Sequence, residues 1–294
     1  MNTHPLGEVL VPVDGFGPST NAAWRAALVA RDLGAPLRLL HVQEGVRAGA
    51  ASEAALRRLA LEIGERTGVT PQLDTVPGKV LEETVRAARD AALLVIGPRP
   101  GNPLRAMVVG TQAEQLIRLC RVPVLVVKKP ATAGYRRVLV PVELVPAARP
   151  MIAAAARLAR DGLEVLHALQ PGDEIGMRAC EVPEWVVRRQ RQRAADEARA
   201  ALHGLIAQAV QPRGVRTMVG FGDAARLALA REAAMRADLL VIGKRTRGLL
   251  ADFFLGSVTQ RLLASARADV LVLPRPTRAG AVEAPPAWMS PAPG

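Results

Sequence analysis

Short apolar runs rich in valine, leucine and isoleucine alternate along this chain with longer segments whose apolar residues recur every three or four positions. The short runs are typical of strands buried in a parallel sheet, and the longer segments of amphipathic helices. In the first half they predict strands at 8–13, 37–42, 72–76, 93–96 and 123–127, and helices at 21–33, 51–67, 80–90 and 111–119. Such alternation implies right-handed crossovers and a parallel sheet covered on both faces.

The same pattern then repeats, which marks an internal duplication. It predicts second-half strands at 137–142, 163–168, 215–219, 239–242 and 270–273, and helices at 147–160, 182–210, 223–236 and from Gly256-Ser257 onward. The offset between matching residues grows from 126 at His41 and His167 to 146 at Gly97 and Gly243. The second half therefore holds an insertion, which accounts for the long helix at 182–210.

We therefore expect an α/β protein of two tandem domains, each a Rossmann-like five-stranded parallel sheet with helices on both faces. The first domain is expected at 1–130 and the second at 135–276, with a linker at 128–134 because of its Pro, Gly, Ala and Thr content. Residues 277–294 are rich in Pro, Ala and Gly without periodicity, which predicts a disordered tail.

In each half a buried strand ends on a glycine, and a loop then leads to a Gly-Thr or Gly-Ser pair that opens a helix. Backbone N–H groups and the positive end of the helix dipole would converge there, which suits a phosphate group. The residues concerned are Gly97, Gly110 and Thr111 in the first half and Gly243, Gly256 and Ser257 in the second. Two such loops predict anion binding at the carboxyl ends of the strands.

The net charge of +12 makes an acidic partner plausible, although much of the excess is arginine spread over helix faces. Lys244, Arg245 and Arg247 would place positive charge near the second phosphate loop, unless they form only a solvated basic loop. Aromatic residues make up 3% of the chain and are not interleaved with basic runs, so no specific nucleic-acid partner is expected. Trp185, just before the run RRQRQR, is expected to pack the long helix onto the sheet.

Other features exclude further classes of protein. The chain has no run of about 18 apolar residues and no signal-peptide pattern, so no membrane span is expected. Cys120 and Cys180 lack metal-ligand spacing, which predicts reduced thiols in a cytoplasmic protein. The chain also lacks an SGGxDS-type loop, a Walker-type loop, an HExxH motif and recognisable Ser–His–Asp spacing, so an enzyme is not expected, although weak nucleotide turnover is compatible with the sequence.

Together these features resemble the universal stress protein family in its tandem two-domain form. The resemblance rests on VLVPVD at 9–14, LLHV at 39–42 and, in both halves, the strand–Gly–loop–Gly-Ser/Thr pattern followed by a Val-rich strand. Domains of this family commonly associate through their last strand. The resemblance therefore implies that 124–127 pairs with 270–273 in an intramolecular pseudo-dimer, and a homodimer is a further option.

The resemblance also implies an ATP site with a known loop motif: Gly, two residues, Gly, nine residues, then Gly-Ser or Gly-Thr. Here Pro100 replaces the middle glycine in the first half, and Thr246 replaces it in the second. Proline fixes φ and lacks an N–H donor, whereas threonine keeps the N–H and adds a hydroxyl. We therefore expect the first phosphate loop to be impaired more than the second.

At the nucleoside end the resemblance implies the opposite. Asp14 matches the family's nucleoside-contacting aspartate, and Glu143, longer by one methylene, stands at that position in the second half. Val42 and Ala168 match positions where family backbones meet adenine. The full set of candidate nucleotide-binding residues is Pro12, Val13, Asp14, Val42, Gly97, Gly110, Thr111, Pro141, Val142, Glu143, Ala168, Gly243, Thr246, Gly256, Ser257 and Val258.

Two functions follow from these observations. The first is a stress-response regulator that binds adenine nucleotide, ATP with or without Mg²⁺, in one or both domains and without obligatory turnover. The alternative is an interaction module that has lost nucleotide binding. It would act through the strand-five interface or through the Arg-rich inserted helix.

Overall fold

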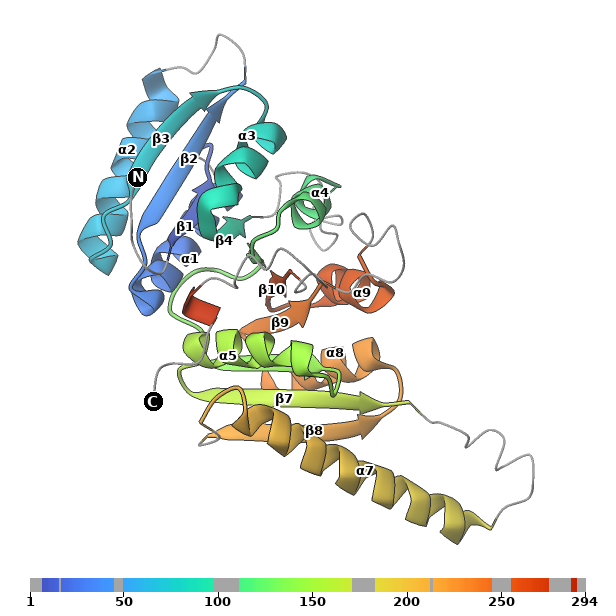
Figure 1. The fold of residues 1–294 in the computed structure, drawn as a ribbon. Helices are drawn as coiled ribbons and strands as arrows, with labels where there is room; N and C mark the ends of the chain where they lie inside the picture. Colours follow the sequence, from blue (N-terminus) through green and yellow to red (C-terminus); the bar gives the residue numbers. More distant parts are fainter. Residues whose placement is uncertain are drawn as a thin grey trace.

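A computed structural model describes residues 7–15, 17–44, 50–97, 111–170, 183–211, 214–244, 255–274 and 287–289. Within these residues ten strands form one sheet in the order β3-β2-β1-β4-β5-β10-β9-β6-β7-β8 (Figure 1). Each half contributes five neighbouring strands that run parallel to one another. The α/β architecture predicted from the sequence is confirmed.

The first half follows the predicted alternation of strands and helices. Its strands are β1 (Glu8–Pro12), β2 (Leu37–Gln43), β3 (Gln72–Pro77), β4 (Ala91–Ile96) and β5 (Val124–Val126). Its helices are α1 (Gly17–Leu33), α2 (Ala50–Thr67), α3 (Val80–Ala87) and α4 (Thr111–Leu119). Strand order 3-2-1-4-5 places β1 between β2 and β4, so the connection after β1 leads to one side, to β2, and the connection after β4 leads to the other, to β5.

The second half repeats this order. Its strands are β6 (Arg137–Val142), β7 (Gly162–Leu169), β8 (Val215–Phe221), β9 (Leu239–Gly243) and β10 (Asp269–Leu273). Its helices are α5 (Arg149–Leu158), α7 (Glu184–Ala207), α8 (Ala224–Met235) and α9 (Ser257–Ser265). The helix α7 occupies the position of the insertion seen in the sequence.

The two halves meet where β5 pairs with β10 in antiparallel fashion. Val124 lies opposite Val272, and Val126 lies opposite Val270. Both strands are buried along their whole length. This pairing uses the inner edge of each half and makes the two five-stranded sheets continuous.

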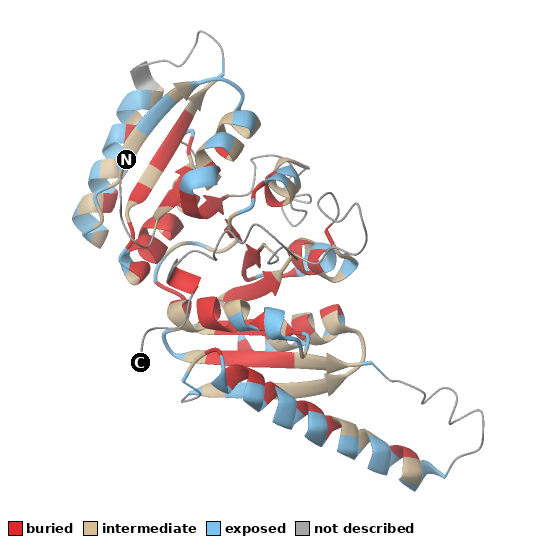
Figure 2. Cartoon of the chain, in the orientation of Figure 1, coloured by how far each residue is buried: buried red, intermediate tan, exposed pale blue. Residues whose placement is uncertain are grey.

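Alternating side chains along the strands build two apolar layers, one on each face of the sheet. Figure 2 shows buried residues along the central strands. Val9 and Val11 face the layer that packs under α1, α2, α5 and α7, whereas Leu10 faces the layer under α3, α4, α8 and α9. This is the two-residue period expected of strands buried on both faces. Both layers run across the junction, where α1 of the first half contacts α5 of the second.

A buried polar cluster also fastens the junction. Asp269, at the start of β10, is fully buried and accepts hydrogen bonds from the Tyr135 hydroxyl (2.7 Å) and the Lys128 and Lys129 amides (2.7 and 2.8 Å). Its carboxylate also lies 3.0 Å from the Arg25 Nε. Because Arg25 belongs to α1 and Asp269 to the second half, the linker is held between the two halves.

The C-terminal tail, expected to be disordered at 277–294, contains one ordered turn among the described residues. Ala287–Met289 form this turn beside α5, seen in red in Figure 1. Trp288 is 1% exposed, and its indole N–H donates to the Ala92 carbonyl (3.1 Å). A buried indole with a satisfied N–H supplies enough apolar contact to order this short segment.

The helix α7 packs on the sheet through one face only. Val187, Ala195 and Leu202 lie on this buried face. Trp185, expected to pack there, is 62% exposed, so that expectation is wrong. Two positions along a helix correspond to about 200°, which puts Trp185 on the side opposite Val187.

Candidate functional site

The candidate residues gather at the carboxyl ends of the central strands in each half. In the first half Val13 and Asp14 follow β1, Val42 lies near the end of β2, and Gly97 follows β4. Because β1 lies between β2 and β4, this edge is the topological switch point where open α/β sheets bind ligands. The corresponding second-half residues are Pro141, Val142, Glu143, Ala168 and Gly243, at the ends of β6, β7 and β9.

The first half presents a positioned carboxylate at this edge. Asp14 is exposed, and its backbone N–H donates to the Ser19 Oγ at 3.2 Å. The Ser19 hydroxyl in turn donates to the Asp14 Oδ1. Ser19 belongs to the first turn of α1, so this reciprocal pair ties the end of β1 to the start of the helix and orients the carboxylate.

The second half lacks this arrangement. Glu143 takes the place of Asp14, and Ala148 stands where the 129-residue offset between Pro12 and Pro141 places the counterpart of Ser19. Alanine has no hydroxyl, so position 148 cannot form the reciprocal pair that Ser19 forms with Asp14.

Two histidines have matching structural roles beside these carboxylates. The His41 Nδ1 lies 3.0 Å from the Val13 carbonyl oxygen, and the His167 Nδ1 lies 2.9 Å from that of Val142. Each contact ties the second strand of its half to the end of the first strand. In each half this anchors the backbone next to the candidate carboxylate.

Gly97 and Gly243 both lie against the first helix of their half, but the contacts differ. A Cβ on Gly97 would lie 2.6 Å from the Pro18 carbonyl oxygen, so the close backbone approach requires glycine there. A Cβ on Gly243 would lie 3.2 Å from the Met151 Sδ, which is part of a flexible side chain. Met151 is the counterpart of Ala22 and therefore fills more of the second edge.

The phosphate-loop residues are described only in part. Gly110 and Thr246 lie outside the described residues, and Thr111 is seen as the first residue of α4. Gly256 precedes α9 with extended backbone angles (φ −60°, ψ 151°), followed by the exposed Ser257 and the half-buried Val258. The first amides of α9 therefore start at the carboxyl edge without a side-chain cap from Gly256.

The carboxyl end of each loop helix is held by a lysine from the other half. The Lys244 Nζ donates to the Arg118 carbonyl in α4 (2.6 Å), and the Lys128 Nζ donates to the Leu263 and Ala266 carbonyls at the end of α9 (2.5 and 2.9 Å). Burial lowers the pKa of Lys128 to about 8. Lys244, predicted to add charge to its own phosphate loop, thus contacts the other half. Sequence reasoning missed both contacts because they join residues more than 100 positions apart.

Some kinds of site find no support in the described part of the chain. There, no three His, Cys, Asp or Glu side chains are grouped so that they could hold a metal ion. A search of the same residues finds no helix with the length and apolar character needed to cross a membrane.

Comparisons with known proteins agree with this architecture. A model of the universal stress protein family matches residues 6–128 and again 134–274. A universal stress protein structure from Pseudomonas aeruginosa is 21% identical, with a TM-score of 0.66 over 92% of this chain and 94% of that chain. One from Archaeoglobus fulgidus is 17% identical, with a TM-score of 0.68 over 92% of this chain and 99% of that chain. At these identities the likeness to both structures shows the fold alone.

Proposed function

This chain belongs to the universal stress protein family, in a tandem two-domain arrangement, and we propose that it binds adenine nucleotide as a cytoplasmic regulator. The observation that carries the proposal is the Asp14–Ser19 pair beside Gly97, at the switch point of the first half. An oriented carboxylate accepts hydrogen bonds from vicinal hydroxyls, which is the chemistry a ribose requires. Neutral hydrogen-bond acceptors would bind the same hydroxyls less strongly.

The first half is proposed as the stronger site for the nucleoside. Asp14 would accept from the ribose, and the backbone near Val42 would border the adenine. Ala22 packs against Gly97 with a methyl group only, whereas the longer Met151 side chain packs against Gly243 in the second half. Triphosphate would extend toward Gly110 and Thr111, and Mg²⁺ would enter with ATP as the counter-ion of its phosphates.

The second half is proposed as a weaker site that favours the phosphate end. Gly256 and Ser257 open α9 without a side-chain cap from Gly256, and the first amides of a helix suit an anion. Glu143 is longer than Asp14 by one methylene, so its carboxylate would meet the ribose hydroxyls at a different position and hold the nucleoside less firmly. Binding would bias association or partner choice, and no turnover is required.

The direct test is the nucleotide content of the purified protein, followed by titration with ATP and Mg²⁺. Asp14→Ala should weaken ATP binding about tenfold, because a hydrogen bond to a charged group contributes roughly 1.5 kcal/mol or more. Asp196→Ala, which removes an exposed carboxylate of α7, is the matched control and should leave binding unchanged. Absence of both co-purified nucleotide and titratable binding would refute the proposal.

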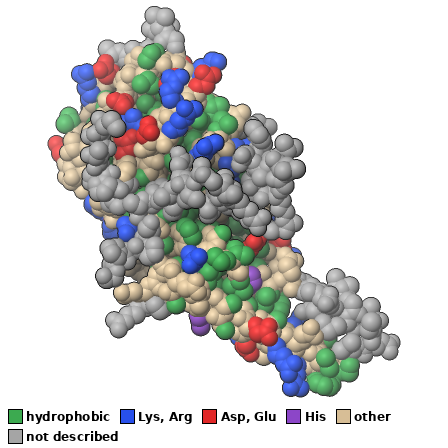
Figure 3. Space-filling model, viewed as in Figure 1, with side chains coloured by type: hydrophobic (Ala, Val, Ile, Leu, Met, Phe, Trp, Pro, Cys, Tyr) green, Lys and Arg blue, Asp and Glu red, His purple; other side chains and the backbone are tan. Residues whose placement is uncertain are grey.

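A second function is favoured by the exposed end of α7. Trp185 is 62% exposed, and Figure 3 shows basic side chains at the projecting tip of this helix. The strand-five edges are already paired with each other inside the chain, so α7 is the better candidate for a partner-binding surface. Trp185→Ser together with Arg188→Ser should then abolish capture of partner proteins without changing ATP binding.

A further inference from the structure

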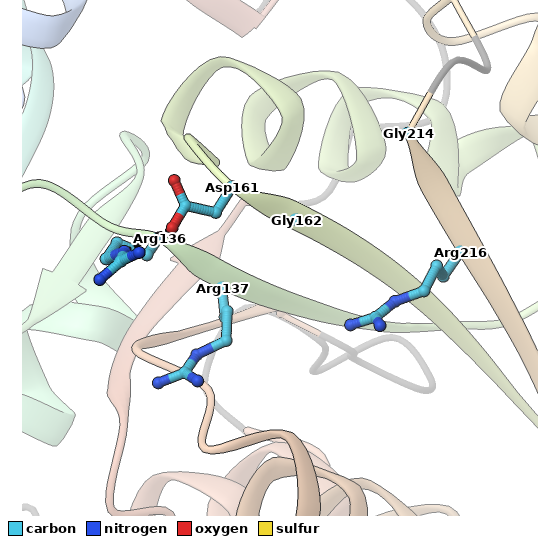
Figure 4. A pocket seen from close by; sticks show the side chains of 6 residues that line it. All are labelled: Arg136, Arg137, Asp161, Gly162, Gly214 and Arg216. Carbon is cyan, nitrogen blue, oxygen red and sulfur yellow. Dashed lines mark hydrogen bonds and ion pairs between the residues drawn. The ribbon is translucent and has the colours of Figure 1, made fainter.

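A hollow of about 340 Å³ lies at the amino ends of β6, β7 and β8, at the end of the sheet opposite the nucleotide edge. Figure 4 shows the arginines that line it, with Arg137 and Arg216 extending from β6 and β8 to the same side of the sheet. Two glycines complete the lining. Because neither glycine has a side chain, the space between the arginine-bearing strands stays open. The full lining is Arg136, Arg137, Asp161, Gly162, Gly214 and Arg216.

The carboxylates around this hollow are already engaged. Asp161 forms an ion pair with the Arg136 Nε. Glu164 is 1% exposed and is held by Arg231 of α8 through two contacts of 2.5 and 2.7 Å. Arg216 reaches the same carboxylate only at 3.6 Å. Arg216 and Arg231 thus share the single Glu164 carboxylate, so positive charge remains at the hollow.

The nearby Asp238 carboxylate accepts from the backbone N–H groups of Arg136 and Arg137 (3.1 and 3.0 Å) and pairs with Lys129, and the Arg137 side chain forms no ion pair among the described residues. None of the described carboxylates lies within ion-pair distance of its guanidinium, and its Nε is buried without a hydrogen-bond partner among these residues. A buried guanidinium N–H without an acceptor is costly, and a bound oxyanion would satisfy it.

Comparison with the first half explains why the Arg137 side chain forms no ion pair among the described residues. At the matching positions Glu8 stands for Arg137 and Arg38 for Glu164, and these two residues form an ion pair of 2.5 Å. In the second half the two charges are exchanged, but the Glu164 carboxylate pairs with Arg231 and Arg216. Arg137 therefore faces the hollow instead of an internal partner.

We propose that this hollow is a second binding site, which takes a phosphate group, either inorganic phosphate or the phosphate of a small ester. Guanidinium groups bind phosphate through paired N–H donors. Arg137 on β6 and Arg216 on β8 lie on either side of β7, so a phosphate in the hollow between them could accept from both, which a single surface arginine does not offer. β6 separates Arg137 from Val142 by roughly 16 Å at about 3.3 Å per residue, so this site is distinct from the nucleotide edge.

The test is titration of the full chain with inorganic phosphate and, separately, glycerol phosphate, against chloride at equal ionic strength. We expect saturable millimolar binding that weakens about tenfold or more in Arg137→Gln with Arg216→Gln. Arg57→Gln, which removes an exposed arginine of α2 paired with Glu53, is the control and should bind like the parent.

Two further variants keep the test decisive. Arg216→Gln alone changes a side chain that is 61% exposed, so it leaves the fold intact and should still weaken binding severalfold. Arg137→Lys keeps the charge but loses the fork of donors, and it should bind more weakly than the parent. Stronger binding of the ester would identify an ester as the ligand. Phosphate binding that is absent, or equal in the double variant and the Arg57→Gln control, would overturn the proposal.

Discussion

The two halves of this protein share one fold but differ in the charges set into it. In the first half Arg38 on β2 lies between Glu8 and Asp74, whereas in the second half Glu164 on β7 lies between Arg216 and Arg231. Duplication kept the apolar strands that build the sheet and exchanged the signs of the polar positions at its amino end. A repeated fold therefore does not imply a repeated binding surface.

The carboxyl edges differ in a similar way. The first edge has an aspartate held by Ser19 and the small Ala22 beside Gly97. The second has Glu143, no serine at the matching position, and Met151 beside Gly243. We conclude that the two edges are chemically unequal, and the following predictions test this inequality and the joint that holds the halves together.

The largest effect is expected at the joint. Asp269→Ala should destabilise the protein by about 3–5 kcal/mol, because it leaves the buried Arg25 without its carboxylate. The first-half counterpart is Pro123, so no equivalent clamp compensates. Urea unfolding measures the effect, with Asp196→Ala as the control. A loss of stability below about 0.5 kcal/mol would mean that the apolar pairing of β5 and β10 alone holds the joint.

The next largest effect on the free energy of unfolding is expected at Glu164 and Arg38, whose charges are exchanged between the two halves. Glu164→Gln should cost about 2–4 kcal/mol in unfolding free energy, since it leaves two arginines around a buried amide. Arg38→Gln should cost less, about 1–2 kcal/mol, because its carboxylate partners are more exposed. Equal costs in urea unfolding at pH 7 would show that the exchange of charges has no energetic consequence.

The Arg38→Gln variant should also respond to pH. Burial raises the pKa of Glu8, and Arg38 opposes this shift, so the variant should raise the pKa further. When the pKa of a carboxyl is higher in the folded than in the unfolded state, the protein loses stability as pH rises from the unfolded-state pKa through the folded-state pKa. The destabilisation should therefore be smaller at pH 4 than at pH 7. A destabilisation that grows on acidification would contradict this account.

The smallest effect concerns the cysteine of the first half. Burial raises the pKa of the Cys120 thiol to about 11. The folded protein should therefore keep this thiol protonated at pH 8 and react slowly with iodoacetamide, as peptide mapping would show. Reaction at the rate of a small-molecule thiol, before any unfolding, would show that Cys120 is accessible.

The fold could be predicted because it depends on local patterns. Buried apolar runs and helical spacing recur in both halves, and their order determines the parallel sheets. The buried polar cluster at the joint could not be predicted in this way, since Arg25 and Asp269 are far apart in sequence and no local pattern links them. The exposure of Trp185 differs from the expectation because the spacing of several apolar residues defines the buried face of a helix, and one aromatic residue does not.

The candidate edge was predicted only in part. The positions of Asp14 and Gly97 follow from strand ends, which the sequence marks clearly. Met151 and the two interdomain lysines could not be recognised, because their roles depend on which helix end or glycine they meet in three dimensions. Contacts between the halves thus require the structure.

Titration of ATP into the parent, Asp14→Ala and Glu143→Ala proteins tests the central claim most directly. The account predicts that Asp14→Ala weakens the tighter binding event about tenfold, while Glu143→Ala changes it less than twofold. A larger loss in Glu143→Ala, or equal losses in both variants, would contradict the proposed inequality of the two edges.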